Sequence, residues 1–117
     1  MMYRNVKSFD RMKGIRSMEL CERLFEGINR FMQPGTVICF PTTPTVAPLK
    51  ESLNIMEAVR DFYSRTMAVT SFSGVGRLPE ISAPLLSIGG CSVGLSIAAS
   101  HYQDEFLLAA VHEMLQL

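Results

Sequence analysis

Residues 81–98 read ISAPLLSIGGCSVGLSIA, and they carry the strongest structural signal of the chain, a hydrophobic pattern that repeats every two residues. Apolar residues alternate with small or polar residues on both sides of Gly89 and Gly90, as expected for two strands that each cover one face. Two glycines supply the positive φ angles that a tight hairpin turn needs. Pro84 has no N–H and should lie where the sheet requires none. The stretch therefore predicts a β-hairpin.

Three segments around the hairpin show the three- and four-residue spacing of amphipathic helices. The first is expected to begin at Ser17, a suitable N-cap, and to end before Pro34. The second covers about 52–67, and the third covers about 104–115 and begins with two acidic residues. Residues 70–79 contain two glycines and a proline, which predict irregular chain.

A further strand is expected at residues 36–40, where the run TVICF is typical of a strand buried on both faces. The next segment, PTTPTVAP at residues 41–48, holds three prolines and should form an extended, rigid loop. The predicted order is α-β-α-β-β-α, in a three-layer α/β arrangement or a remnant of one. We expect a core of Ile38, Phe40, Leu85, Val93, Leu95, Ile97, Phe106 and Val111.

The composition indicates one domain with a high content of apolar residues. The chain has 117 residues, 48% of them hydrophobic and 19% charged, and a formal net charge of zero. A neutral chain lacks the positive field that binds nucleic acid or an anionic membrane, so neither partner is expected. The excess of apolar residues predicts that part of the surface is covered by other protein.

The expected location is the cytoplasm. Cys21, Cys39 and Cys91 are far apart and odd in number, which argues against a disulfide framework. No apolar run is long enough to span a bilayer. Residues 1–16 form a basic leader, expected to be disordered, and a leader of this kind keeps organelle targeting as a minor alternative. Residues 17–117 form the domain.

The segment 90–94, GCSVG, matches the G-x-S-x-G nucleophile motif, and Asp104 and His112 follow it in the order of a hydrolase triad. That motif needs a strand-to-helix turn after the serine, whereas the pattern here continues as a strand. A small hydrolase that uses Ser92 is therefore the weakest of three functional hypotheses; the other two are given below. His112 is expected to be half-buried structure, and neither it nor His101 has the spacing of a metal ligand, so we expect no metal and no cofactor.

Four blocks of the chain carry a family resemblance. They read ICFPTTPTVAP at 38–48, GVGRLPEISAP at 74–84, SVGLSIA at 92–98 and DEFLL at 104–108. In this order they resemble the amidase signature family, whose blocks read P-T-x-P followed by A-P, then N-x-x-G-x-P-A-x-S-x-P, P-V-G-L-Q-x-x-G and D/E-x-x-L-L.

The resemblance implies the C-terminal part of an amidase fold, with a mixed sheet flanked by helices. In that family, amide C–N bonds are hydrolysed by two serines and a lysine in the N-terminal part, so this chain should hold no catalytic residue and be inactive by itself. Thr42, Thr43, Ser73 and Gly74 would border the substrate pocket. The expected partner is the missing N-terminal catalytic part, or a second copy that pairs through exposed strands.

Three positions depart from the family pattern. Gly74 stands where the family has Asn, Arg77 where it has Gly, and Glu80 where it has Ala. The substrate class is therefore not implied. The alternative to an amidase segment is a non-catalytic binding or assembly module that keeps part of the amidase fold and pairs with another chain through its strand edges.

Overall fold

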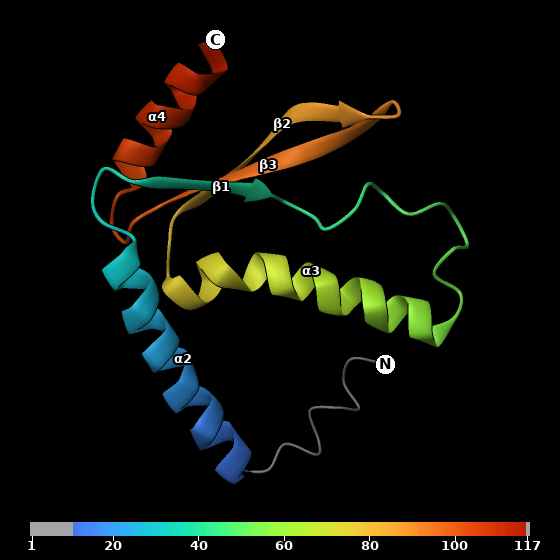
Figure 1. Cartoon of the computed structure of the whole chain (residues 1–117), viewed down its shortest axis with the longest axis horizontal. Helices are drawn as coiled ribbons and strands as arrows, with labels where there is room; N and C mark the ends of the chain where they lie inside the picture. The colour runs from blue at the N-terminus through green and yellow to red at the C-terminus, as the bar shows by residue number, and fades with distance from the viewer. Residues whose placement is uncertain (1–10, 117) are drawn as a thin grey trace.

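The chain is built on one three-stranded antiparallel sheet with helices on its two faces (Figure 1). The computed structural model describes residues 11–116. In the sheet, β3 (Cys91–Ala99) lies between β1 (Val37–Pro41) and β2 (Glu80–Ile88), and both pairings are antiparallel. The predicted element order is confirmed. The described strands contain no parallel pair, where the resemblance implied a mixed sheet.

The hairpin of β2 and β3 is confirmed in detail. Ile88 pairs with Cys91, and the two glycines between them have φ angles of 56° and 78°. The register shifts between Ala83 and Leu86, so Pro84 lies at an irregularity on an edge strand. Its missing N–H therefore removes no hydrogen bond from the sheet interior.

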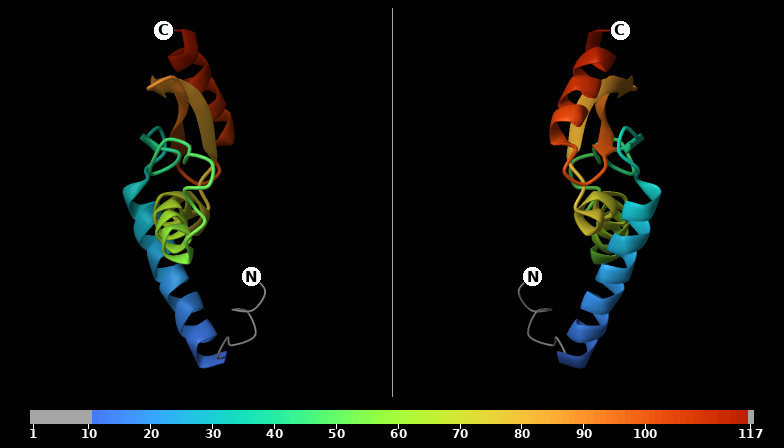
Figure 2. Two further views of the ribbon diagram at one scale, coloured as in Figure 1. Left: turned by 90° about the vertical axis from the view of Figure 1, so that its right-hand side faces the viewer. Right: turned by 90° about the vertical axis from the view of Figure 1, so that its left-hand side faces the viewer.

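Alternating residues of β3 serve two separate cores. Ile97 and Ala99 pack against α4 (Asp104–Gln116) on one face. Ala98 packs on the other face with Met32 and Leu78, which lie at the ends of α2 (Arg11–Phe31) and α3 (Met56–Gly76). In Figure 1, α3 runs below β1 while α4 rises on its opposite side. The sheet is thus the middle of three thin layers, seen from two sides in Figure 2.

Helix α2 begins at Arg11, so the N-cap predicted at Ser17 is wrong. Ser17 lies inside the helix, where its Oγ donates to the carbonyl oxygen of Lys13 at 2.8 Å. Serine tolerates this position because its hydroxyl can bond to the preceding turn. Residues 11–16 of the predicted leader are therefore helical, and residues 1–10 lie outside the described part of the chain.

Helix α3 begins at Met56 and continues to Gly76, so the irregular chain predicted from residue 70 is wrong as far as residue 76. It ends in a Schellman motif, in which the Arg77 N–H donates to Gly74 and the Leu78 N–H donates to Ser73. Arg77 itself is left-handed, with φ 52° and ψ 42°. Gly74 and Gly76 predict a break when read alone, but the helix continues to Gly76, which is buried against Ile28 of α2.

The predicted core is only partly correct. Ile97 and Val111 are buried, and Ile38, Phe40, Leu95 and Phe106 pack against the two clusters. Val93 is half-buried. Leu85 is exposed. It lies within the register shift between Ala83 and Leu86, where the regular alternation of β2 is interrupted. The strand predicted to be buried on both faces is the edge strand β1, which is at most half-buried, and His112 is exposed rather than half-buried.

The left-handed Arg77 gives a prediction for the helix end. A side chain in this conformation costs about 1 kcal/mol that glycine avoids. Arg77 also places its guanidinium 4.2 Å from the centre of the Phe25 ring and pairs with Glu22 at 2.6 Å. Arg77→Ala loses both contacts and keeps the strained backbone, whereas Arg77→Gly loses the contacts and relieves the strain. We expect the urea midpoint of the alanine variant to lie below that of the glycine variant; equal midpoints would contradict the backbone argument.

Candidate functional site

Three hydroxyl groups meet where the proline-rich loop leaves β1. Thr42 Oγ1 lies 2.7 Å from Ser82 Oγ and 2.9 Å from Ser96 Oγ, so it links β2 and β3. The Thr42 N–H donates to the carbonyl oxygen of Gly94 at 2.9 Å. Only glycine fits at position 94, because a Cβ there would lie 2.7 Å from Thr42 Oγ1 and 2.8 Å from Ser82 Oγ. We call Thr42, Ser82 and Ser96 the hydroxyl cluster.

The other residues predicted to border a pocket lie elsewhere. Thr43 is exposed, and its hydroxyl donates to the carbonyl oxygen of Thr45 within the loop. Ser73 and Gly74 lie in the last turns of α3, where Ser73 is buried and Gly74 is exposed. Within residues 11–116 the Ser73 hydroxyl has no hydrogen-bond partner. The structure therefore groups Thr42 with serines of the hairpin, and not with Ser73 or Gly74.

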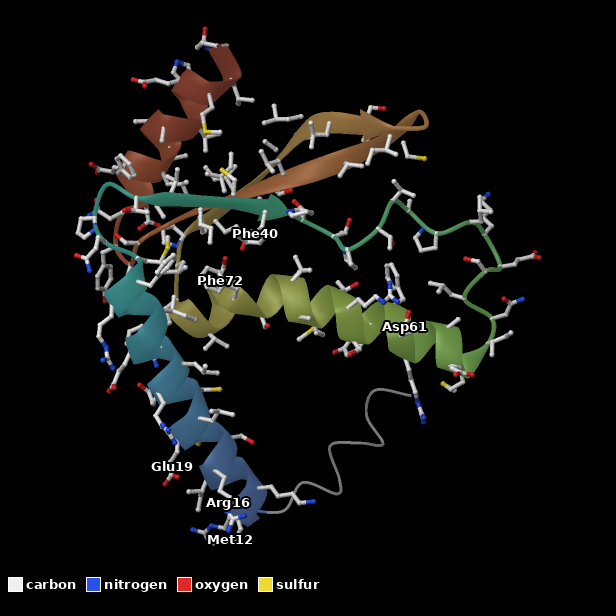
Figure 3. The ribbon with its side chains drawn as sticks, viewed as in Figure 1. Met12, Arg16, Glu19, Phe40, Asp61 and Phe72 are labelled. Carbon is white, nitrogen blue, oxygen red and sulfur yellow. The ribbon has the colours of Figure 1, made fainter. Side chains whose placement is uncertain are left out.

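The rings of Phe40 and Phe72 lie between β1 and the last turns of α3 (Figure 3). Their centroids are 6.1 Å apart and their planes meet at 79°, an edge-to-face pair. This contact fixes the end of α3 beneath the strand that carries the proline-rich loop.

An open cleft of about 460 Å³ lies between the proline-rich loop and the N-terminal half of α3. Its size falls in the range of small-molecule sites, and its walls are mainly apolar. On one side Asp61 and Arg65 form an exposed ion pair at 3.1 Å. The residues that line the cleft are Thr45, Val46, Ala47, Pro48, Leu49, Ser52, Leu53, Ala58, Asp61, Phe62 and Arg65. The lining starts at Thr45, three residues after Thr42 in the same loop.

Sequence reasoning missed a second cluster, between α2, the end of α3 and the turn that precedes α4. Arg77 contacts Phe25 and Glu22, as described above. In addition, His101 Nδ1 donates to the Arg77 carbonyl oxygen at 2.6 Å. The His101 ring also meets the Phe25 ring edge-on at 5.8 Å. These residues are far apart in the chain, so no local pattern could have indicated them. The cluster joins α2 to the end of α3 and to the turn before α4, and its described contacts include no free nucleophile.

The hydrolase motif is part of the hairpin, as the sequence argument against it requires. Ser92 is exposed and is the second residue of β3 after the glycine turn. Among residues 11–116, the structure brings neither Asp104 nor His112 into hydrogen-bond contact with it, and those two residues begin and continue α4. The strained strand-to-helix turn that would raise the serine into a site is absent from this segment.

Three further observations concern the part of the chain that the structure describes. No group of three His, Cys, Asp or Glu side chains gathers there in a way that could hold a metal ion. No helix within that part is both long and apolar enough to cross a membrane. The three cysteines are free and exposed.

Comparisons with known proteins found no match to this chain, whether among family models, curated proteins or solved structures.

The hydroxyl cluster gives a prediction with a neighbouring control. Thr42→Val keeps the shape of the side chain but removes the hydroxyl that serves Ser96, which is fully buried. Because a buried hydroxyl without a partner is costly, we expect the variant to lose about 1–2 kcal/mol of unfolding free energy in urea. Thr43→Val removes only an exposed hydrogen bond and should change it by less than about 0.5 kcal/mol. Equal losses would mean that the cluster is not a structural unit.

Proposed function

We propose that this chain is the C-terminal portion of an amidase-like C–N hydrolase and that it is inactive without the catalytic part. One observation carries the proposal, namely that four blocks resembling the amidase signature occur in the family's order on consecutive elements. The first covers β1 and the proline-rich loop, the second the end of α3 and β2, the third β3, and the fourth the start of α4.

The backbone at Arg77 supports this alignment. The family has glycine at that position, and here the residue adopts the left-handed conformation in which glycine is the favoured residue. Gly74, where the family has Asn, lies on an open helix surface with no atom within 4 Å of an added Cβ, so a larger residue fits there.

The surface of α3 supports a larger assembly. One side of the helix covers the sheet through Phe72, while the other exposes Met56, Val59, Tyr63 and Met67, which are spaced three or four residues apart. A helix that is apolar on opposite sides is usually buried on both. The radius of gyration, 17.1 Å, also exceeds the roughly 13 Å expected for a compact domain of this length. In the complete enzyme, the catalytic part would cover this outer side of α3.

The proposed role of the candidate site is to form one wall of the substrate pocket. Thr42 is held by the hydroxyl cluster, and the loop after it presents Thr43 and the apolar cleft beside α3. Acyl transfer in this family uses a serine activated through a second serine by a lysine, and backbone N–H groups that hold the oxyanion. In the family these groups lie in the N-terminal part, so the role of the four proposed border residues would be contact with the substrate.

Sequencing of the full transcript that encodes the chain, together with an activity assay of the purified protein, tests the proposal. We expect an upstream or separate coding segment with a lysine and a G-G-S-S-G-G sequence, and no labelling of the purified chain by a fluorophosphonate. A catalytic segment absent from the transcript and from the neighbouring genes would contradict the proposal. Fluorophosphonate labelling at Ser92 would instead support a free-standing hydrolase.

The second candidate is a non-catalytic binding or assembly module, favoured by the open edges of β1 and β2 and the exposed apolar side of α3. It predicts a tight complex with a chain unrelated to amidases. The transcript distinguishes the two, because only the amidase portion requires a catalytic segment.

A further inference from the structure

Helix α2 carries an exposed apolar stripe on the side that is not used for packing. Leu20, Leu24, Gly27 and Phe31 follow one another at intervals of four, three and four residues, which places them on one line along the helix. The exposed fractions of the three large side chains are 55%, 47% and 67%. This spacing is that of the a and d positions of a coiled coil.

The opposite side of α2 is already occupied. Asn29 Nδ2 donates to the carbonyl oxygen of Gly76 at 3.1 Å, and Ile28 lies against the same glycine. Phe25 lies beneath the guanidinium of Arg77. The helix is therefore anchored to the body through one side, and the apolar stripe remains free. Figure 2 shows that its N-terminal half projects past α3, away from the sheet.

A row of arginines borders the stripe. Arg16, Arg23 and Arg30 are exposed and lie seven residues apart, so they occupy the same position of three successive heptads. Arg16 is labelled near the start of the helix in Figure 3. The ion pairs within residues 11–116 join Arg65 to Asp61 and Arg77 to Glu22, so the structure gives none of these three arginines a carboxylate partner.

From this arrangement we infer that one surface of α2 is a docking site for an acidic amphipathic helix of another protein. We call this surface the α2 stripe; it is formed by Leu20, Leu24, Phe31 and the three arginines. An apolar seam flanked by charges of one sign selects a partner whose flanking charges have the opposite sign. The inference goes beyond the proposed function, because it rests on α2 alone and not on the amidase blocks.

A second copy of this chain does not fit the stripe. In an antiparallel pair of α2 helices the two arginine rows would face each other, and like charges repel. In a parallel pair each row would face Gly14, Cys21 and Ile28, which offer no negative charge. An anionic membrane fits less well than an acidic helix, because Glu19 and Glu26 lie beside the arginines on their outer side and would be repelled by it.

The test uses the full chain and two synthetic helical peptides of about four heptads, both with leucine at a and d. One has glutamate at e and g, and the matched peptide has lysine there. Binding is followed by fluorescence anisotropy of the labelled peptide. Because the row of three arginines attracts the acidic peptide and repels the basic one, we expect the acidic peptide to bind about tenfold more tightly, with a preference that shrinks in high salt.

Charge reversal on α2 should reverse the preference between the two peptides, a result that an unfolded variant would not give. The triple variant R16E/R23E/R30E should bind the basic peptide more tightly than the acidic one. Leu24→Ala should weaken binding of both peptides, whereas Leu108→Ala, at an exposed leucine on α4, should change neither. Equal binding of the two peptides, or an unchanged preference in the triple variant, would overturn the inference.

The same samples test two other occupants of the α2 stripe, a membrane and a second copy of the chain. Binding of the chain to phosphatidylserine vesicles more tightly than to the acidic peptide would show that α2 recognises a membrane instead. A dimer in analytical ultracentrifugation that dissociates in the Leu24→Ala variant would show that the occupant is a second copy. Either result would overturn the proposal of an acidic partner helix, and neither bears on the amidase proposal, which is tested by the transcript.

Discussion

Leu107→Ala is expected to lower the free energy of unfolding by about 2–5 kcal/mol. Leu107 is only 2% exposed and packs with Ile97, Ala99 and Val111 in the cluster that holds α4 on the sheet. Truncation removes the transfer free energy of the buried carbons and leaves a cavity that so small a cluster cannot refill. The same change should release α4, so the helix should exchange its amide hydrogens faster than the strands do.

The adjacent leucine provides the matched control. Leu108 lies on the same helix turn but is 62% exposed, so Leu108→Ala removes the same atoms without opening a cavity. We expect this variant to stay within about 0.5 kcal/mol of the parent in urea unfolding. If both variants lost the same stability, α4 would not be packed on the sheet through Leu107, and the layer on this face would be wrong.

The hairpin could be predicted from the sequence because its determinants are local. A two-residue period and a glycine pair leave few alternatives to an antiparallel hairpin. The end of α3 could not be predicted in this way, since Gly74 and Gly76 indicate a break when read alone. Position 76 requires glycine for a tertiary reason, the approach of Ile28 from α2, and no local pattern shows that. The exposure of Leu85 likewise depends on a register shift within the paired strands.

The candidate site was predicted only in part. Thr42 was named because of the amidase resemblance, but its partners Ser82 and Ser96 are separated from it by 40 and 54 residues. Such pairs become visible only when strand order and register are known, since the order β1-β3-β2 brings them to one end of the sheet. Ser73 and Gly74 were assigned to the same border by resemblance alone. Whether all four face one substrate stays a prediction.

The crossing of α2 and α3 gives the second large expected effect. A Cβ added at Gly76 would lie 2.7 Å from Ile28 Cγ2 and 3.0 Å from Leu78 Cγ. Both atoms belong to short branched side chains that pack with the cluster of Met32 and Ala98, so they cannot move aside without disturbing it. Gly76→Ala should therefore cost about 1–3 kcal/mol through overpacking, despite the better helix propensity of alanine.

Gly74 makes the comparison decisive because it lies in the same last turns of α3. An added Cβ there meets nothing within 4 Å, so Gly74→Ala should gain about 0.5–1 kcal/mol from helix propensity and the restricted unfolded chain. Urea unfolding of both variants should thus show changes of opposite sign. Matching gains would mean that α2 does not approach α3 at Gly76. The α2 stripe would then lose its fixed orientation, because Asn29 and Ile28 hold α2 on this same glycine.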